Sequence, residues 1–170
     1  ALSKGDYIID LAADDVLKPN CIALQLQGFA ESKYENLGLV FGNAEWITEK
    51  GDFIASYFPT DENGKGLEPQ PTGDIYCNIL NGKSKLCSVA ALTKRTVFDQ
   101  LNGYDENLAY EDLDLWIRAS RVYNFDYIDE IVVSKRVLDN SMYTLLVQKN
   151  NPKTRRFNYS TFLIMGKVYT

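Results

Sequence analysis

The chain has 170 residues, of which 45% are hydrophobic and 24% charged, a composition typical of one soluble domain with a real core. Its net charge of -5 and the lack of a basic stripe argue against a general nucleic-acid binder. It contains no histidine, which excludes a Ser-His-Asp or Cys-His catalytic group and any histidine-ligated metal site within it.

The three cysteines, Cys21, Cys77 and Cys87, lie far apart in the sequence with apolar neighbours. This pattern predicts buried free thiols in a reducing compartment. No apolar run approaches the roughly 18 residues needed to span a bilayer. We therefore expect a cytoplasmic protein.

The charge is unevenly distributed along the chain. Residues 149–170 hold five basic residues and no acidic ones, whereas residues 1–148 hold 13 basic and 23 acidic residues. A basic C-terminal helix over 149–170 would allow peripheral contact with an anionic membrane, although a solvated helix face is the commoner explanation.

Strand and helix patterns alternate over the first half of the chain. The sequence predicts a helix stub at residues 1–4 ended by Gly5, a buried strand at 6–11, a helix at 20–33 and a strand at 37–47. A turn at 49–52 followed by an apolar run at 53–58 predicts a hairpin. Residues 59–71 form a long Pro- and Gly-containing loop of the kind that is usually functional or mobile.

The second half continues the alternation. We expect a helix at 72–80 capped by Thr72, a strand at 86–92, a helix from a Thr93 cap to about 101 ended by Gly103, and a helix at 111–122. Strands at 125–128 and 131–134 and helices at 140–148 and 154–168 follow. The alternation predicts a single α/β domain over 1–170, with three layers, α/β/α, around a mixed sheet.

Two acidic clusters contain the candidate catalytic and binding residues. Asp14 and Asp15 follow the first strand, where ligands of open α/β sheets bind, and paired carboxylates there can hold Mg²⁺ or Mn²⁺ against a diphosphate. A simple turn before the next helix explains them as well. Glu111 and Asp112 stand at the start of a helix, where a carboxylate becomes a general base only if a hydroxyl reaches it.

Two further residues near these clusters have a structural explanation as well. Asp114 has an i,i+4 partner in Arg118, which indicates an ion pair within the helix. Arg136 follows a strand, where it can meet a phosphate or extend from the sheet edge into solvent.

The order and spacing of these blocks resemble the family 2 glycosyltransferases of the GT-A fold, over about residues 1–142. The Tyr110-Glu111-Asp112-Leu113-Asp114-Leu115-Trp116-Ile117-Arg118 block is fairly specific. The other matching blocks are Gly5–Ile8 with Ala13–Asp15 and Pro19, Leu37–Glu45, Asn102–Glu106, Tyr127–Glu130, and Ser134–Val137.

The resemblance implies an inverting glycosyltransferase that moves a sugar from a nucleotide-diphosphate donor to a hydroxyl acceptor, a glycan or lipid-linked glycan, in polysaccharide or glycoconjugate synthesis. It implies that Asp15 coordinates the divalent metal, that Asp14 lies beside the donor sugar and ribose, and that Asp112 is the general base with Glu111 beside it. Arg136 would belong to the donor site.

The chain departs from the family at Ala12, where a carboxylate is usual, and at Leu138, where a His is frequent. The family's nucleotide-binding first half would precede Ala1, so the chain corresponds to the portion from about the fourth strand onward. That portion alone would be inactive, and its exposed sheet edge would favour a homodimer or aggregation. The alternative is a non-catalytic nucleotide-sugar-binding or protein-interaction module with the same fold.

Overall fold

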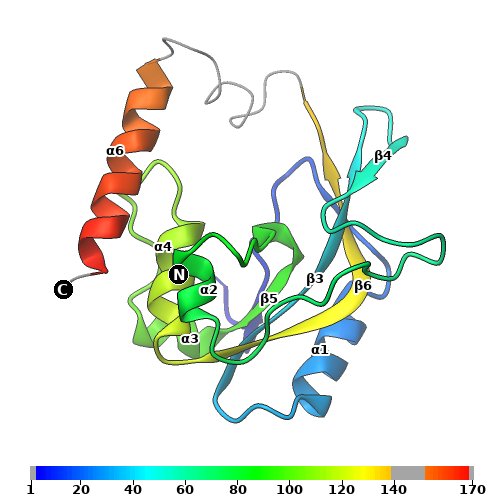
Figure 1. Ribbon diagram of the computed structural model, residues 1–170, viewed down its shortest axis with the longest axis horizontal. Coiled ribbons are helices and arrows are strands. Elements are labelled where there is room, and N and C mark those ends of the chain that lie inside the picture. Colours follow the sequence, from blue (N-terminus) through cyan, green and yellow to red (C-terminus); the bar gives the residue numbers. More distant parts are fainter. Residues whose placement is uncertain (1–2, 139–151, 169–170) are drawn as a thin grey trace.

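The computed structural model describes residues 3–138 and 152–168 (Figure 1). Its strands are β1 (Tyr7–Ile8), β2 (Val16–Leu17), β3 (Leu37–Ile47), β4 (Phe53–Ser56), β5 (Ala91–Lys94) and β6 (Asn124–Arg136). Its helices are α1 (Cys21–Glu31), α2 (Tyr76–Leu80), α3 (Arg95–Gln100), α4 (Asp112–Ser120) and α6 (Pro152–Lys167), with a 3-10 turn at Ser88–Ala90.

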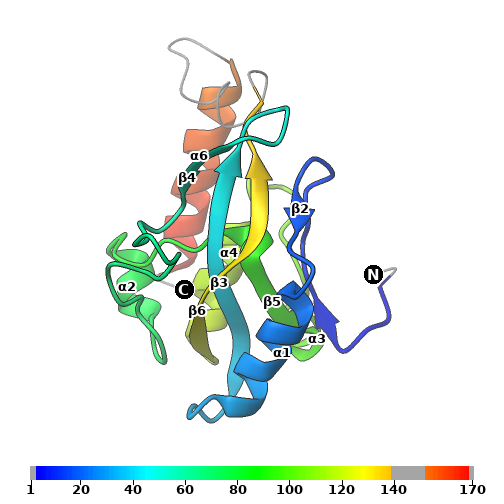
Figure 2. The same cartoon turned by 90° about the vertical axis from the view of Figure 1, so that its right-hand side faces the viewer.

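The strands form one mixed sheet. Its order is β1-β5-β3-β6-β2, and β4 also pairs with β3. β3 and β6 run parallel along most of their length, while every other pair is antiparallel. The register of β3 against β6 shifts at three points, and Figures 1 and 2 show that these long strands curl strongly.

The core lies on both faces of β3. Leu39 and Phe41 pack in a cluster with buried residues of α2, α3, α4 and α6. Val40, between them, packs against Gly28 of α1. A Cβ at position 28 would lie only 2.9 Å from a γ carbon of Val40, so the missing side chain of Gly28 lets the helix approach the strand. Alternate residues of an extended strand point to opposite faces, so a nearly continuous apolar run here is a strand covered on both sides.

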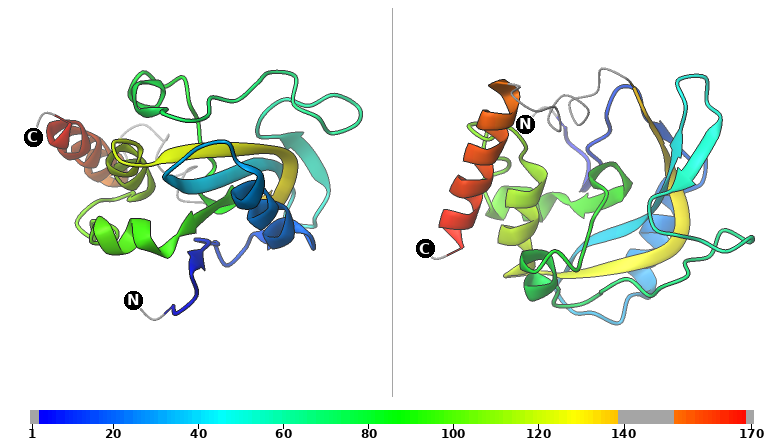
Figure 3. Two further views of the ribbon diagram at one scale, coloured as in Figure 1. Left: turned by 90° about the horizontal axis from the view of Figure 1, so that it is seen from below. Right: turned by 45° about the horizontal axis from the view of Figure 1, so that its top comes forward.

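The two faces of the sheet are covered by different numbers of helices. α1 lies by itself against β3 and β6, whereas α2, α3, α4 and α6 gather at the other side of the molecule (Figures 1 and 3). The architecture is thus mixed α/β, as the alternation predicted. The narrower expectation of a GT-A fold stays a prediction.

Several predicted elements are confirmed with small changes of boundary. They include the helix at 20–33, the strand at 37–47, the hairpin around 49–52, the helix at 111–122 and the C-terminal helix. Gly103, with φ of 71°, does occupy the left-handed region just beyond α3, and Asn102 before it has φ of 59°. The two strands predicted at 125–128 and 131–134 are one continuous strand, β6.

The helices predicted at 72–80 and from 93 to about 101 are present as the shorter α2 and α3, but their predicted caps and some other predictions are wrong. Neither threonine caps a helix: α2 begins at Tyr76, and the Thr72 hydroxyl bonds to that of Tyr34 at 2.7 Å, while Thr93 lies within β5. The strand predicted at 86–92 is a 3-10 turn followed by β5. Ser3 and Lys4 are not helical, and the helix predicted at 140–148 lies outside the described residues.

The first strand also differs from its prediction. β1 is only two residues long, and the side chains of Tyr7 and Leu11 are 36% and 40% exposed, so this segment is not buried. β1 stands at the end of the strand order, and in the described parts of the chain it pairs only with β5. The exposed edge expected from the sequence is therefore present.

Two further predictions concern the state of the cysteines and the presence of a membrane-spanning helix. All three cysteines are free, with Cys21 and Cys87 buried as predicted and Cys77 exposed, contrary to the prediction. Among residues 3–138 and 152–168, no helix has the length and apolar character to cross a bilayer.

Candidate active site

Glu111 and Asp112 stand at the first turn of α4, after a loop held in place by short-range contacts. In that loop the Asp105 carboxylate accepts the backbone N–H of Asn107 at 3.0 Å. The Oδ1 of Asp112 accepts the backbone N–H of Leu113 at 2.8 Å. This contact fixes the Asp112 carboxylate at the positive end of the helix dipole.

Burial governs the proton affinity of both carboxyls. It raises the pKa of Asp112, and hydrogen bonding to Leu113 and the nearby Lys135 ammonium oppose the rise. Burial likewise raises the pKa of Glu111, with a further contribution from the Asp112 charge. A carboxylate that binds a proton more strongly is a better general base near neutral pH.

Two residues not singled out in the sequence, Asp10 and Tyr104, belong to this group. Burial raises the pKa of the Tyr104 hydroxyl, and the charges of Asp10, Glu111 and Asp112 raise it further. Asp10 therefore lies within electrostatic range of both α4 carboxylates. Its position as the one acid inside the apolar run Tyr7–Leu11 is a signal that could have identified it.

Lys135, on β6, connects the two acidic clusters. Its positive charge lowers the pKa of both Asp112 and Asp15, although burial leaves each of them raised overall. Within the described residues no carboxylate lies within ion-pair distance of its ammonium. The fold thus brings Asp15 and Asp112, about a hundred residues apart in sequence, within electrostatic range of the same lysine.

The Asp14–Asp15 pair occupies the turn that leads into β2, and it does not directly follow β1, which ends at Ile8. Asp15 is 9% exposed, and its Oδ1 accepts the backbone N–H of Arg136 at 2.8 Å. Its Oδ2 is buried and has no hydrogen-bond partner among residues 3–138 and 152–168. Burial raises the pKa of Asp15, as expected for a carboxyl withdrawn from water.

Arg136 fastens this turn to the rest of the sheet. Its Nε donates to the carbonyl of Asp14 at 3.1 Å, and its Nη1 donates to the carbonyls of Thr48 and Glu49 at 3.1 and 2.6 Å. These contacts join the acidic turn to the β3–β4 hairpin. They favour the structural explanation of Arg136, and its predicted place in a donor site stays a prediction.

The described residues do not form a metal site by themselves. No group of three or more His, Cys, Asp or Glu in the described parts of the chain is arranged to hold a metal ion. One oxygen of Asp15 is committed to Arg136, the other is enclosed, and the neighbouring charged groups include two cations. Coordination of Mg²⁺ or Mn²⁺ by Asp15, with Asp14 beside the donor, remains a prediction.

Asp114 has the structural role that its spacing indicated. Its side chain is 1% exposed, its Oδ2 accepts a hydrogen bond from the Nε of Arg118 at 2.8 Å, and the Nη2 of Arg118 lies 2.6 Å from the same oxygen in an ion pair. Lys167, on α6, reaches Oδ1 at 2.8 Å and also pairs with Asp105 at 2.6 Å. Arg118 further donates to the carbonyls of Leu101 and Gly103. This network fixes the turn before α4, and hence the position of Asp112.

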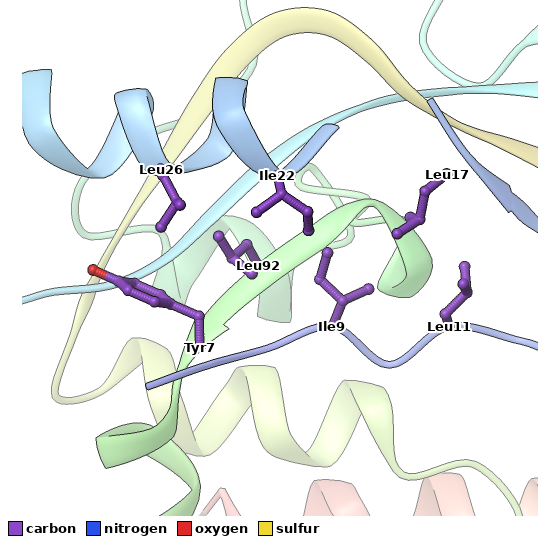
Figure 4. Close-up of a pocket in the computed structure, with 7 residues that line it drawn as sticks. All are labelled: Tyr7, Ile9, Leu11, Leu17, Ile22, Leu26 and Leu92. Carbon is purple, nitrogen blue, oxygen red and sulfur yellow. The ribbon is translucent and has the colours of Figure 1, made fainter. Parts of the chain in front are cut away.

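An open apolar groove of about 410 Å³ lies on the other side of the N-terminal segment (Figure 4). The α4 carboxylates do not line it. Its walls are the side chains of Tyr7, Ile9, Leu11, Leu17, Ile22, Leu26 and Leu92. With no charged group among them, this groove is unsuited to a nucleotide or a sugar.

No protein-family model matches the chain, and a search of curated proteins returns no similar sequence.

Proposed function

We propose that this chain is the catalytic and acceptor portion of an inverting glycosyltransferase, with Asp112 as the general base. The observation that carries the proposal is that Asp10, Tyr104, Glu111 and Asp112 lie within electrostatic range of one another, with Lys135, whose charge acts on both Asp112 and Asp15, nearby. The resemblance of the α4 block to family 2 glycosyltransferases supplies the reaction class.

In this mechanism Asp112 takes the proton of the acceptor hydroxyl while the hydroxyl oxygen forms a bond to the anomeric carbon of the donor sugar. The bond from that carbon to the diphosphate breaks on the opposite side, and its electron pair leaves with the nucleoside diphosphate. The raised pKa of Asp112 favours the proton transfer, and Glu111 keeps the acceptor subsite negative. The Lys135 ammonium is the cation available to face a departing phosphate.

Because the residues that the structure describes include no cluster of three or more potential metal ligands, no step is assigned to a metal. A second candidate function follows from the contacts of Asp15 and Arg136. Asp15 and Arg136 are engaged in contacts within the protein, which favours a non-catalytic module that binds a nucleotide sugar without turnover or serves as a protein-interaction module. Calorimetry with UDP and Mn²⁺ separates these two versions of the module: binding of neither favours the interaction module.

The test compares Asp112→Asn with wild type in the protein at its full natural length. Sugar transfer is measured with a panel of UDP-, GDP- and dTDP-sugars, and donor binding is measured by calorimetry. We expect Asp112→Asn to lower transfer by at least about a hundredfold while donor binding survives. Glu106→Gln, which alters an exposed acid in the same loop, is the matched control and should transfer normally. Near wild-type transfer by Asp112→Asn would show that Asp112 is not the base.

A further inference from the structure

Helix α6 (Pro152–Lys167) has one face fixed to the body of the protein. On that face Ser160 and Ile164 are each 1% exposed, and the Ser160 hydroxyl accepts the backbone N–H of Ala109 at 2.8 Å. The ring of Phe157 stacks on Tyr110 at 4.2 Å between centroids. With the Lys167 ion pairs, these contacts hold α6 rigidly beside the loop that leads into α4.

The opposite face of α6 carries large apolar side chains in solvent. Tyr159 is 60% exposed, Phe162 71% and Met165 38%, and their spacing of three residues places them on one side of a helix. Figure 1 shows α6 at the margin of the molecule. We call Tyr159, Phe162 and Met165 the outer apolar face.

Positive charge adjoins the outer apolar face. Arg155 and Arg156, one turn before Tyr159, are exposed, and no salt bridge with them is present in the described residues. α6 contains no acidic residue, and neither does the whole sequence from 149 to 170. The remainder of the chain has a net charge of -10, so this helix is a basic exception on an acidic protein.

We propose that the outer apolar face of α6 docks on an anionic membrane surface. Exposed aromatic side chains beside arginines on one helix are the features that place a helix in the interface plane of a bilayer, with the rings at headgroup depth and the cations at lipid phosphates. A second copy of this chain fits less well, because it presents the same arginines and no acid on α6 to pair with them. The docking is independent of the proposed sugar transfer, but it would hold Asp112 close to a lipid-borne hydroxyl.

Co-sedimentation with vesicles tests the proposal in the wild-type chain and three variants. The vesicles contain either phosphatidylcholine alone or phosphatidylcholine with phosphatidylglycerol. Arg155→Gln/Arg156→Gln should weaken binding to the anionic vesicles about 25-fold, since each basic residue near such a surface contributes about fivefold. Tyr159→Ser/Phe162→Ser should weaken it about tenfold or more. Phe53→Ser, at a residue 62% exposed on the β3–β4 hairpin, is the matched control and should bind like wild type.

Three outcomes overturn the proposal. One is absence of wild-type binding to the anionic vesicles, and another is equal loss in Phe53→Ser and in the α6 variants. The third is lipid-free self-association, seen by sedimentation velocity, that Tyr159→Ser/Phe162→Ser abolishes, which would make the face an interface between copies. Circular dichroism of each variant confirms that the helix content is intact.

Discussion

The same substitution made two residues apart in α4 should have opposite effects, and this separates the functional carboxylate from the structural one. Asp114→Asn removes the charge that both Arg118 and Lys167 contact, at a side chain that is 1% exposed. Asp112→Asn removes a half-buried carboxylate whose pKa burial has already raised. We expect the first variant to be destabilised and the second to be as stable as wild type or more so.

The magnitude follows from the contacts. Asp114 accepts one hydrogen bond from the Nε of Arg118 and one from Lys167, and the Nη2 of Arg118 adds an ion pair at 2.6 Å. Each hydrogen bond to a charged group contributes about 1.5–3 kcal/mol. The side chains of Arg118 and Lys167 are 23% and 37% exposed, so water replaces part of what they lose. We therefore take the lower part of the range for a broken buried pair, about 3 kcal/mol. In a chain of this size that lowers Tm by about 6–12 °C.

Urea unfolding followed by tryptophan fluorescence measures both variants, since Trp116 lies in α4 and is 9% exposed. A double-mutant cycle with Arg118→Met then gives the coupling energy, which should exceed about 1 kcal/mol for groups in one network. The reasoning is refuted if Asp114→Asn costs less than about 1 kcal/mol, or if Asp112→Asn is equally destabilising.

Four other changes test separate parts of the structure. Asp15→Asn should be more stable than wild type near neutral pH. The pKa of Asp15 is raised in the folded state, so ionisation of Asp15 lowers the stability of the wild-type protein as the pH rises. Urea titrations should show the stability difference between variant and wild type closing below about pH 4. Lys135→Met removes a charge that lowers the pKa of Asp112, so the acidic limb of a pH–rate profile should move to higher pH. An unchanged limb would show that Lys135 does not influence the proton affinity of the base. Gly42→Ala should cost about 1–3 kcal/mol in thermal or urea unfolding, since its Cβ would stand 2.9 Å from a carbonyl oxygen of β6; a neutral result would mean that the strands can separate there. Light scattering should show wild type dimeric or aggregated through the open edge at β1, and Leu11→Lys more nearly monomeric; a monomeric wild type contradicts this.

The sequence was sufficient to predict an element or a contact where the local pattern of residues agrees with their burial in the fold. The apolar run that forms β3 is covered on both faces, and the turn at 49–52 can only reverse the chain, so the hairpin was predictable. Asp114 and Arg118 were predictable as a pair because helical spacing alone brings them together. Predictions failed where a distant contact decides the outcome. Thr72 bonds to Tyr34, 38 residues away, and therefore does not cap α2.

The candidate site was only half predictable for the same reason. Each acidic cluster was visible in the sequence, but the influence of Lys135 on both was not, because only the folded chain brings this lysine within electrostatic range of Asp112 and Asp15. The backbone contact of Asp15 with Arg136 also spans 121 residues, and nothing in the local pattern of either residue indicates it. Asp15, predicted from the sequence to be a metal ligand, also holds the end of β6 through this contact, and its metal role stays a prediction.

This division of roles bears on how a donor diphosphate would be held. Ala12 leaves the acidic turn with two carboxylates, of which Asp15 is enclosed and Asp14 remains partly open. A diphosphate needs positive charge opposite it, and Lys135 is a cation whose charge acts on both acidic clusters. If the chain transfers sugars, the balance of charge at the donor therefore depends on this lysine as well as on any divalent ion, and loss of Lys135 should weaken nucleotide-diphosphate binding even where Mn²⁺ is abundant.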